Sequence, residues 1–301
     1  MIFENITSKF LNESDNINSE SLKELEDIIQ AKQGVSCNLN TIDTFNVDSM
    51  SGLFAHAFNF NCDISEWETE NVTDMSCMFL SAESFNQPLN SWNVSNVRDM
   101  HGMFCHAIAF NKPLDEWNVS NVVDMSYMFK VAASFEQSLN SWNVSNVKYM
   151  SCMFMGAEHF DQPLNDWNVS NVCRMDSMFC YANLFNQPLN DWNVSNVVDM
   201  YNMFAGAESF NQPLNDWDVS NVKNMDGMFE FAKAFNQPLD NWNVSNVRNM
   251  SYMFAGAKAF NHPLDNWNVS YDCETLNAFK NTTLKNRGNI PNWCRTRREY
   301  K

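Results

Sequence analysis

Residues 89–110 read LNSWNVSNVRDMHGMFCHAIAF and contain the pattern from which the fold can be predicted. The same unit of 25 residues returns along nearly the whole chain. Tryptophan recurs every 25 residues from Trp67 to Trp267, and methionine keeps the same step from Met75 to Met250. A fixed period of this length is typical of a solenoid, in which each repeat buries its apolar side chains against its neighbours.

Within one repeat, the apolar residues follow two spacings. Leu89, Trp92 and Val94 have the spacing of a short strand with alternate residues inward. After them, apolar residues recur at steps of three and four, as on one face of a helix or 3₁₀-helix; they are Val97, Met100, Met103, Phe104, Ala107 and Phe110. The repeat therefore predicts an α/β repeat solenoid of the leucine-rich-repeat type. Each 25-residue coil would contain one short parallel strand plus a helical or 3-10 segment.

The chain divides into three segments by its relation to the repeat. Residues 1–41 precede it, and a capping box followed by an apolar helical face predicts a short helix over residues 22–33. We expect this segment to cap the first coil, because the end of a solenoid otherwise exposes core and unpaired backbone. Residues 42–293 form about ten coils, and residues 294–301 form a basic C-terminal tail.

The pattern L-x-x-W-x-V-S-N-V-x-x-M-x-x-M-F-x-x-A-x-x-F-N-Q-P, repeated over about residues 42–293, resembles a known family. It is similar to the BspA-like leucine-rich repeat surface proteins, and in particular to their 25-residue Mycoplasma lipoprotein-type repeat, DUF285. The resemblance implies a leucine-rich-repeat solenoid. For bacterial members it also implies adhesion at the cell surface.

Charge and composition exclude several classes of partner. The formal net charge is -17, so we expect neither nucleic acid nor an anionic membrane as a partner, since both require neutralising Lys and Arg. No apolar run approaches the roughly 18 residues of a membrane span. The sequence carries no phosphate-binding glycine motif and no nucleophile-elbow motif, and it has only eight glycines. We therefore expect no enzyme activity and no cofactor.

The expected compartment is the cytoplasm, with the cell surface as the alternative that the family resemblance implies. The N-terminus lacks the basic and apolar regions of a signal peptide. Asn-Val-Ser occurs seven times at one point of the repeat, where glycans of a eukaryotic secretory route would obstruct stacking. Cysteines that share a repeat position, such as Cys77 and Cys152, are about 14 Å apart and too far for a disulfide. Free thiols are expected, and only the pairing of Cys273 with Cys294 stays open.

Two polar arrays have alternative interpretations. The Asn93 position and its equivalents are expected to form a ladder of amides that satisfy one another, with a regular array for glycan as the rival. An acidic array precedes the tryptophans at Glu66, Glu116, Asp166, Asp191 and Asp216. We expect this array to be a solvated edge rather than a Ca²⁺ site, because no Ca²⁺-binding loop accompanies it. No His/Cys cluster has zinc spacing, so no metal site is expected.

The candidate functional residues are large or charged side chains at positions that the repeat does not fix. They are Tyr149, Met155, Arg174, Tyr181, Leu184, Tyr201 and Phe231. Tyr, Phe and Arg on a rigid platform are typical anchors of protein interfaces. The sequence thus predicts a monomeric, non-enzymatic scaffold that binds a protein partner. The alternative is a cell-surface or host-interaction adhesin that binds a glycan or a matrix protein.

Overall fold

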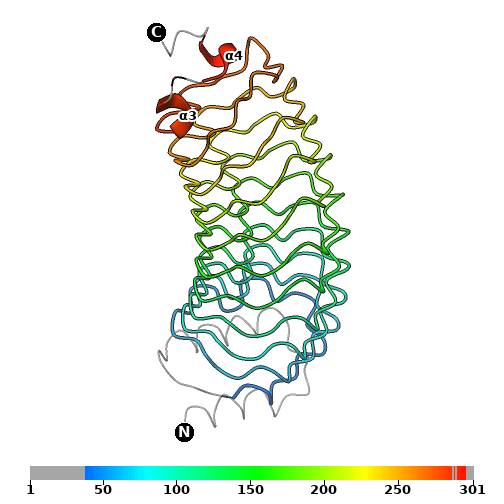
Figure 1. The fold of residues 1–301 in the computed structure, drawn as a ribbon. Helices are drawn as coiled ribbons and strands as arrows, with labels where there is room; N and C mark the ends of the chain where they lie inside the picture. The colour runs from blue at the N-terminus through cyan, green and yellow to red at the C-terminus, as the bar shows by residue number, and fades with distance from the viewer. Residues whose placement is uncertain (1–37, 287, 289, 296–301) are drawn as a thin grey trace.

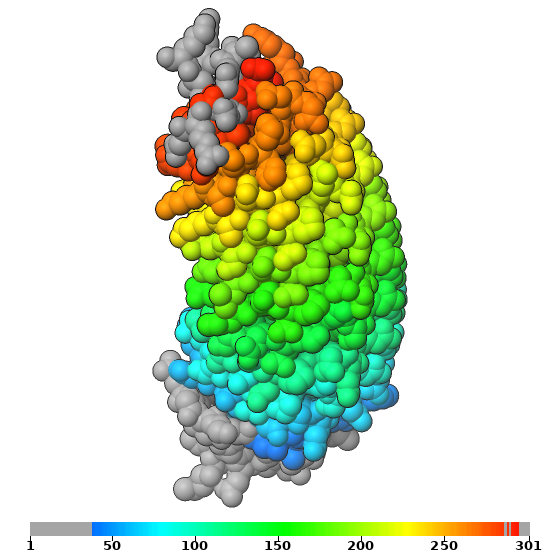
Figure 2. Space-filling view, viewed as in Figure 1, coloured from blue at the N-terminus to red at the C-terminus, as the bar shows by residue number. Residues whose placement is uncertain are grey.

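The protein is a stack of coils in the computed structural model, which describes residues 38–286, 288 and 290–295. The coils follow one another along a single axis and build an elongated, bowed body (Figures 1 and 2). At the C-terminal end lie two short helices, α3 (Thr283–Asn286) and α4 (Asn292–Arg295). The predicted N-terminal helix and residues 296–301 of the tail lie outside the described residues.

Each coil is in exact register with the next. Parallel bridges join residues 25 positions apart from Ser49–Asp74 to Asn249–Glu274, and Asn38 pairs with Asp63 in the same way. Equivalent residues of successive repeats therefore form columns along the body. We name each column after its member in residues 89–113. The repeat solenoid that the sequence predicts is confirmed at this level.

The predicted strand at Leu89–Val94 is wrong. The backbone there turns instead, with the Trp92 N–H donating to Leu89 O at 3.0 Å and the Val97 N–H donating to Val94 O at 3.0 Å. Side chains make the contacts between coils on this side: Trp92 Nε1 donates to Ile64 O at 3.1 Å, and Asn96 Nδ2 donates to Glu70 O at 2.7 Å. Leu89, Trp92 and Val94 are buried as expected, because successive turns also direct them inward.

The predicted helical segment after Val97 is also wrong, because it is a series of overlapping β-turns. The Met103 N–H donates to Met100 O at 3.2 Å and the Ala107 N–H donates to Phe104 O at 3.0 Å. Between these turns, the Met100 N–H donates to Asp124 O of the next coil at 3.0 Å. A helix would use such donors internally. In this segment, the N–H group of every second residue donates to a carbonyl of the next coil, and these bonds form a backbone ladder.

The turns require a left-handed backbone at two columns. In the Gly102 column and the His106 column, every described coil has a positive φ, with values of 61° at Gly102 and 58° at His106. This is the conformation that the third residue of a type II turn needs. Most members of the two columns are not glycine, and that choice costs free energy in each coil.

The core is a set of stacked aromatic columns. Phe104 lies 5.5 Å from Phe79 of the preceding coil and 4.1 Å from Phe110 of its own coil, measured between ring centroids. The indoles of Trp67 and Trp92 stack at 6.5 Å. These rings and the two methionine columns are buried throughout the middle coils. The core is thus continuous along the body.

The C-terminal end closes the core with a modified coil. Thr275 replaces the methionine of the Met100 column, and its hydroxyl oxygen is buried without a hydrogen-bond partner. Trp293 continues the tryptophan column even though it comes one residue late. Its ring stacks on Trp267 at 6.2 Å, and its Nε1 donates to Leu264 O at 2.8 Å.

Candidate interaction surface

The backbone ladder has an outer face with five columns. In the segment from Asp99 to His106, the side chains of Met100, Met103 and Phe104 are directed into the core. The columns named after residues 99, 101, 102, 105 and 106 remain for the outer surface. We call these five columns the ladder face.

Residue identity on the ladder face is not fixed by stacking. Elsewhere the repeated polar residues bond the next coil: Asn86 Oδ1, for example, accepts the Asn111 N–H at 3.0 Å. On the ladder face the backbone makes the bonds between coils, so the residue type in the Asp99 column can differ from one coil to the next. Its members are Ser49, Asp74, Asp99, Asp124, Tyr149, Arg174, Asp199, Asn224, Asn249 and Glu274.

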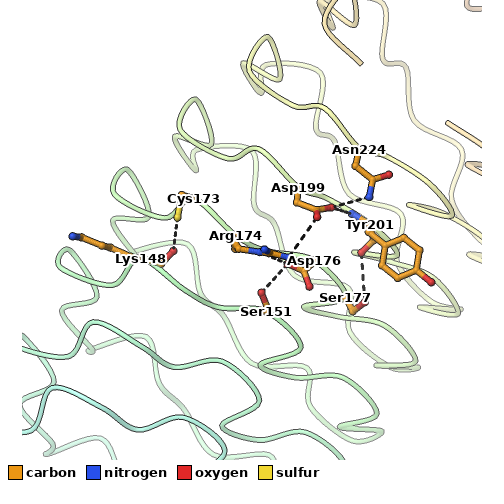
Figure 3. Close-up of polar contacts among 9 residues, drawn as sticks. All are labelled: Lys148, Ser151, Cys173, Arg174, Asp176, Ser177, Asp199, Tyr201 and Asn224. Atoms are coloured by element: carbon orange, nitrogen blue, oxygen red, sulfur yellow. Dashed lines mark hydrogen bonds and ion pairs between the residues drawn. The ribbon is translucent and has the colours of Figure 1, made fainter. Parts of the chain in front are cut away.

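A polar network crosses the middle of the ladder face (Figure 3). Arg174 Nε donates to Asp176 Oδ1 at 3.1 Å, and Arg174 Nη2 lies 3.5 Å from Asp199 Oδ2 of the next coil. The hydrogen bond to Asp176 and the charge of that residue raise the pKa of Arg174. Ser151 Oγ donates to Asp176 Oδ1 at 2.7 Å. The network therefore ties three successive coils together on the surface.

The network also holds the backbone of Tyr201. Asp199 Oδ1 accepts the Tyr201 N–H at 3.0 Å and a bond from Asn224 Nδ2 at 3.2 Å. In Figure 3 the Tyr201 ring extends away from these polar groups. Tyr149 lies on the other side of Arg174 and pairs with it through a parallel bridge. Arg174 is thus flanked by two exposed tyrosines.

The structure divides the seven candidate residues into groups. Tyr149, Arg174 and Tyr201 lie together in the Asp99 and His101 columns. Tyr181 and Phe231 share the His106 column two coils apart, and half-buried Met155 lies in the neighbouring Cys105 column. Exposed Leu184 belongs to the turn after the ladder segment and lies outside the ladder face.

Sequence reasoning missed the contact that Tyr181 and Phe231 each make with a glycine of the following coil. A Cβ atom placed on Gly206 would lie 2.5 Å from Cδ1 of Tyr181, and one on Gly256 would collide with the Phe231 ring. Each aromatic side chain therefore leans over the glycine of the following coil. The signal was available, because large residues and glycine alternate in this column from Val131 to Gly256.

The two arrays that the sequence singled out are explained by local bonds. Asn93 Oδ1 accepts the Ser95 N–H at 3.2 Å, so the Asn93 column forms turns within each coil. The predicted ladder of amides in that column is wrong; the neighbouring Asn96 column bonds across the coils instead. In the acidic array, Asp166 Oδ2 accepts a bond from Asn140 Nδ2 at 2.6 Å. Among the described residues, no group of three His, Cys, Asp or Glu is placed to hold a metal.

The carboxylates of the ladder face are stacked in the first coils. Asp74, Asp99 and Asp124 pair in succession along the Asp99 column. Burial raises the pKa of Asp99, and the charges of Asp124 and Asp74 raise it further. The hydrogen bond from the His101 N–H lowers this pKa, but the net shift is upward. This end of the ladder face is therefore acidic, in contrast to the Arg174 network.

The family described as "Mycoplasma protein of unknown function, DUF285" matches residues 1–115, 88–192 and 180–293. The chain belongs to this family. No curated protein matches this DUF285 chain.

Among solved structures, this DUF285 protein matches the "Crystal structure of TLR13-ssRNA13 complex" at 10% sequence identity with a TM-score of 0.22. The match covers 81% of this chain and 48% of that chain, so this chain spans about half the length of that protein. In the part of the DUF285 chain that the structure describes, no helix has the length and apolar character needed to cross a membrane.

Among the described residues, five cysteines are buried thiols, whereas Cys77 and Cys173 are half-buried thiols. Burial raises the pKa of Cys105 to about 11 and that of Cys180 to about 12. Cys273 and Cys294 are each buried as thiols. Cys62 is disulfide-bonded, so the prediction of thiols throughout is wrong.

Proposed function

We propose that this DUF285 protein is a non-enzymatic scaffold that binds a protein partner on the middle coils of the ladder face. The observation that carries the proposal is the arrangement of Tyr149 and Tyr201 around Arg174. The two tyrosines are 39% and 41% exposed, although neither is needed to stack the coils. Exposed Tyr beside Arg is the composition of protein-interface anchors.

The Arg174 network supports this proposal because it fixes the backbone beneath the anchors. Arg174 bonds carboxylates on two coils, and one of these, Asp199, accepts the Tyr201 N–H. Side chains on a pre-organised platform lose little conformational freedom when a partner binds. The assignment to the leucine-rich-repeat class, which rests on the sequence resemblance, agrees with such a role.

A non-enzymatic role is supported by the state of the thiols. The thiolate is the reactive form of cysteine, and a pKa raised to about 11 or 12 keeps Cys105 and Cys180 protonated at neutral pH. The carboxylates around Arg174 are engaged in the bonds that build the network. We accordingly propose no catalytic residue, no cofactor and a monomeric state.

Affinity capture with three forms of the protein tests the proposal. Wild type, a Tyr149→Ala/Tyr201→Ala double variant and a Tyr271→Ala variant would each be coupled to resin. Tyr271 is the matched control, because it is a 92% exposed tyrosine of the last coil. A specific partner should bind wild type and Tyr271→Ala and be lost from the double variant. A partner retained equally by all three would move the site elsewhere.

A second candidate, a cell-surface adhesin, is favoured by one observation. Disulfides persist in oxidising compartments and are rare in the cytosol, and Cys62 is disulfide-bonded. This observation weighs against the cytoplasmic location expected from the N-terminus. Alkylation of the protein in intact cells, followed by mass spectrometry of the Cys62 peptide, distinguishes the two locations. An oxidised Cys62 on protein labelled from outside the cell supports the adhesin, and a reduced thiol in the cytoplasm supports the scaffold.

A further inference from the structure

The His106 column carries a row of apolar side chains with a regular spacing. Val131, Tyr181 and Phe231 are two coils apart from one another. The coils after each of them have glycine in this column, at Gly156, Gly206 and Gly256. We call these three large residues the platform row.

The two aromatic rings of the platform row lie along the surface. The atoms of Tyr181 nearest to a Cβ placed on Gly206 are Cδ1 at 2.5 Å, Cε1 at 2.7 Å and Cγ at 3.2 Å. The same three ring atoms of Phe231 are nearest to Gly256. Each ring therefore lies over the glycine with one of its faces and does not point at the glycine end-on. Tyr181 is still 53% exposed and Phe231 48% exposed, so each ring has one covered face and one open face.

The floor between the platforms contains small residues and carries no net charge. In the neighbouring Cys105 column, Cys180, Ala205 and Ala255 are buried. In the coils from Val131 to Gly256, these two columns hold two charged residues of opposite sign, Lys130 and Glu230. This neutrality is unusual for a chain with a net charge of -17. The row therefore suits an uncharged ligand, and the charge of the whole molecule repels polyanions.

The spacing of the platforms indicates a ligand that is itself periodic. Coils paired through parallel bridges advance by about 4.8 Å each, so successive platforms are roughly 10 Å apart. An extended β-1,4-linked glycan presents sugars of the same orientation at alternate units, at a similar interval. The negative face of an aromatic ring attracts the polarised C–H groups of a sugar face. We propose that the platform row binds a neutral β-1,4-linked glycan lying along the axis of the solenoid.

A protein partner fits the row less well. Anchors of protein interfaces cluster near the centre of a contact and fill pockets. The platform row instead repeats at equal intervals, with one glycine coil between neighbours. The inference does not rest on the proposed scaffold function, because it uses Tyr181 and Phe231 and leaves Tyr149 and Tyr201 to the protein partner.

Isothermal titration calorimetry with three hexasaccharides tests the proposal. Cellohexaose and N-acetylated chitohexaose are β-1,4-linked, and maltohexaose is the α-1,4-linked control with a helical shape. We expect at least one β-1,4 hexasaccharide to bind wild type and maltohexaose not to bind. Tyr181→Ala and Phe231→Ala should each weaken binding by at least about tenfold, as expected for the loss of one aromatic contact. Tyr201→Ala, the matched control on the same face, should bind as wild type does.

Circular dichroism and thermal melting of each variant confirm that the fold is intact. The proposal is overturned if neither β-1,4 hexasaccharide binds, or if maltohexaose binds equally well. It is also overturned if folded Tyr181→Ala and Phe231→Ala bind the sugar as wild type does. Loss of a protein partner from these two variants, without any sugar binding to wild type, would assign the row to the protein interface instead. This last result would leave the scaffold function standing, so the two proposals fail separately.

Discussion

The two sides of each coil join their neighbours by different means. On the tryptophan side, side chains make the bonds: Trp167 Nε1 donates to Leu139 O at 2.9 Å, and Asn171 Nδ2 donates to Ser145 O at 2.7 Å. On the ladder side, the backbone makes them, as from the Met150 N–H to Arg174 O at 3.0 Å. Backbone bonds do not depend on side-chain identity. The tryptophan side must therefore repeat its residues, whereas the ladder face is free to vary and to bind.

The largest effect should come from removing a tryptophan. Trp167→Ala would leave a cavity in the indole column and an unpaired Leu139 carbonyl. Such a truncation costs about 3–5 kcal/mol of unfolding free energy. Urea denaturation followed by circular dichroism measures this loss. A cost below about 1 kcal/mol would show that side chains on this side do not hold the coils together.

Gly206→Ala should have the next largest effect. Position 206 has a φ of 70°, and the added Cβ would meet the Tyr181 ring. We expect a loss of about 3 kcal/mol, which combines left-handed strain with overpacking. The matched control is Gly52→Ala, where φ is 66° and nothing lies within 4 Å. That change should cost only about 1 kcal/mol.

A double-mutant cycle isolates the contact between the ring and the glycine. In a Tyr181→Ala background, Gly206→Ala should cost no more than Gly52→Ala does, because only the strain remains. An undiminished cost in that background would mean that the ring does not lie over Gly206. Thermal or urea unfolding of the four proteins supplies all terms of the cycle.

The smallest effect concerns the pH dependence of Asp99. Its pKa is raised in the folded protein, first by burial, so ionisation opposes folding. The penalty is absent below the unfolded pKa of about 3.9 and grows as pH rises through the folded pKa. Asp99→Asn should therefore be more stable than wild type at neutral pH, with the difference vanishing in acid. Asparagine fits this column, because Asn249 Oδ1 accepts the Ser251 N–H at 2.9 Å.

Asp218 provides a control of opposite sign on the tryptophan side. Hydrogen bonds from Ser220 lower the pKa of Asp218, so its ionised form stabilises the fold above the unfolded pKa. This stability is lost as pH falls through the folded pKa. Asp218→Asn should accordingly be less stable than wild type at neutral pH and equal to it in acid. The same sign for both variants would contradict the assigned causes.

The buried columns could be predicted from the sequence because the core fixes them. Met100, Phe104 and Phe110 recur without exception through the middle coils, and all three are buried. The local backbone could not be predicted from the same residues. A step of three apolar positions is common to a helix and to overlapping turns, and the positive φ that separates them falls on residues such as His106 and Tyr127. Histidine and tyrosine do not predict a left-handed backbone, as glycine would.

The candidate surface was predictable only in part, for a related reason. The variable residues could be recognised, since Tyr149 and Arg174 depart from their column. Which of them lie together depends on the turns. Tyr201 lies near Arg174 because its N–H donates to Asp199, which Arg174 also contacts. Leu184 lies outside the ladder face, in the turn that follows the ladder segment. Neither relation is visible in the spacing.

On the ladder side, the backbone and not the side chains holds the coils together, and a triple variant tests this. Tyr149, Tyr181 and Tyr201 would all be replaced by serine, a residue that already occurs on this face at Ser81 and Ser177. Surface changes of this kind cost about 0.5 kcal/mol or less each, so the unfolding free energy should fall by at most about 1.5 kcal/mol. A loss of about 3 kcal/mol or more, comparable to that of Trp167→Ala, would contradict the claim.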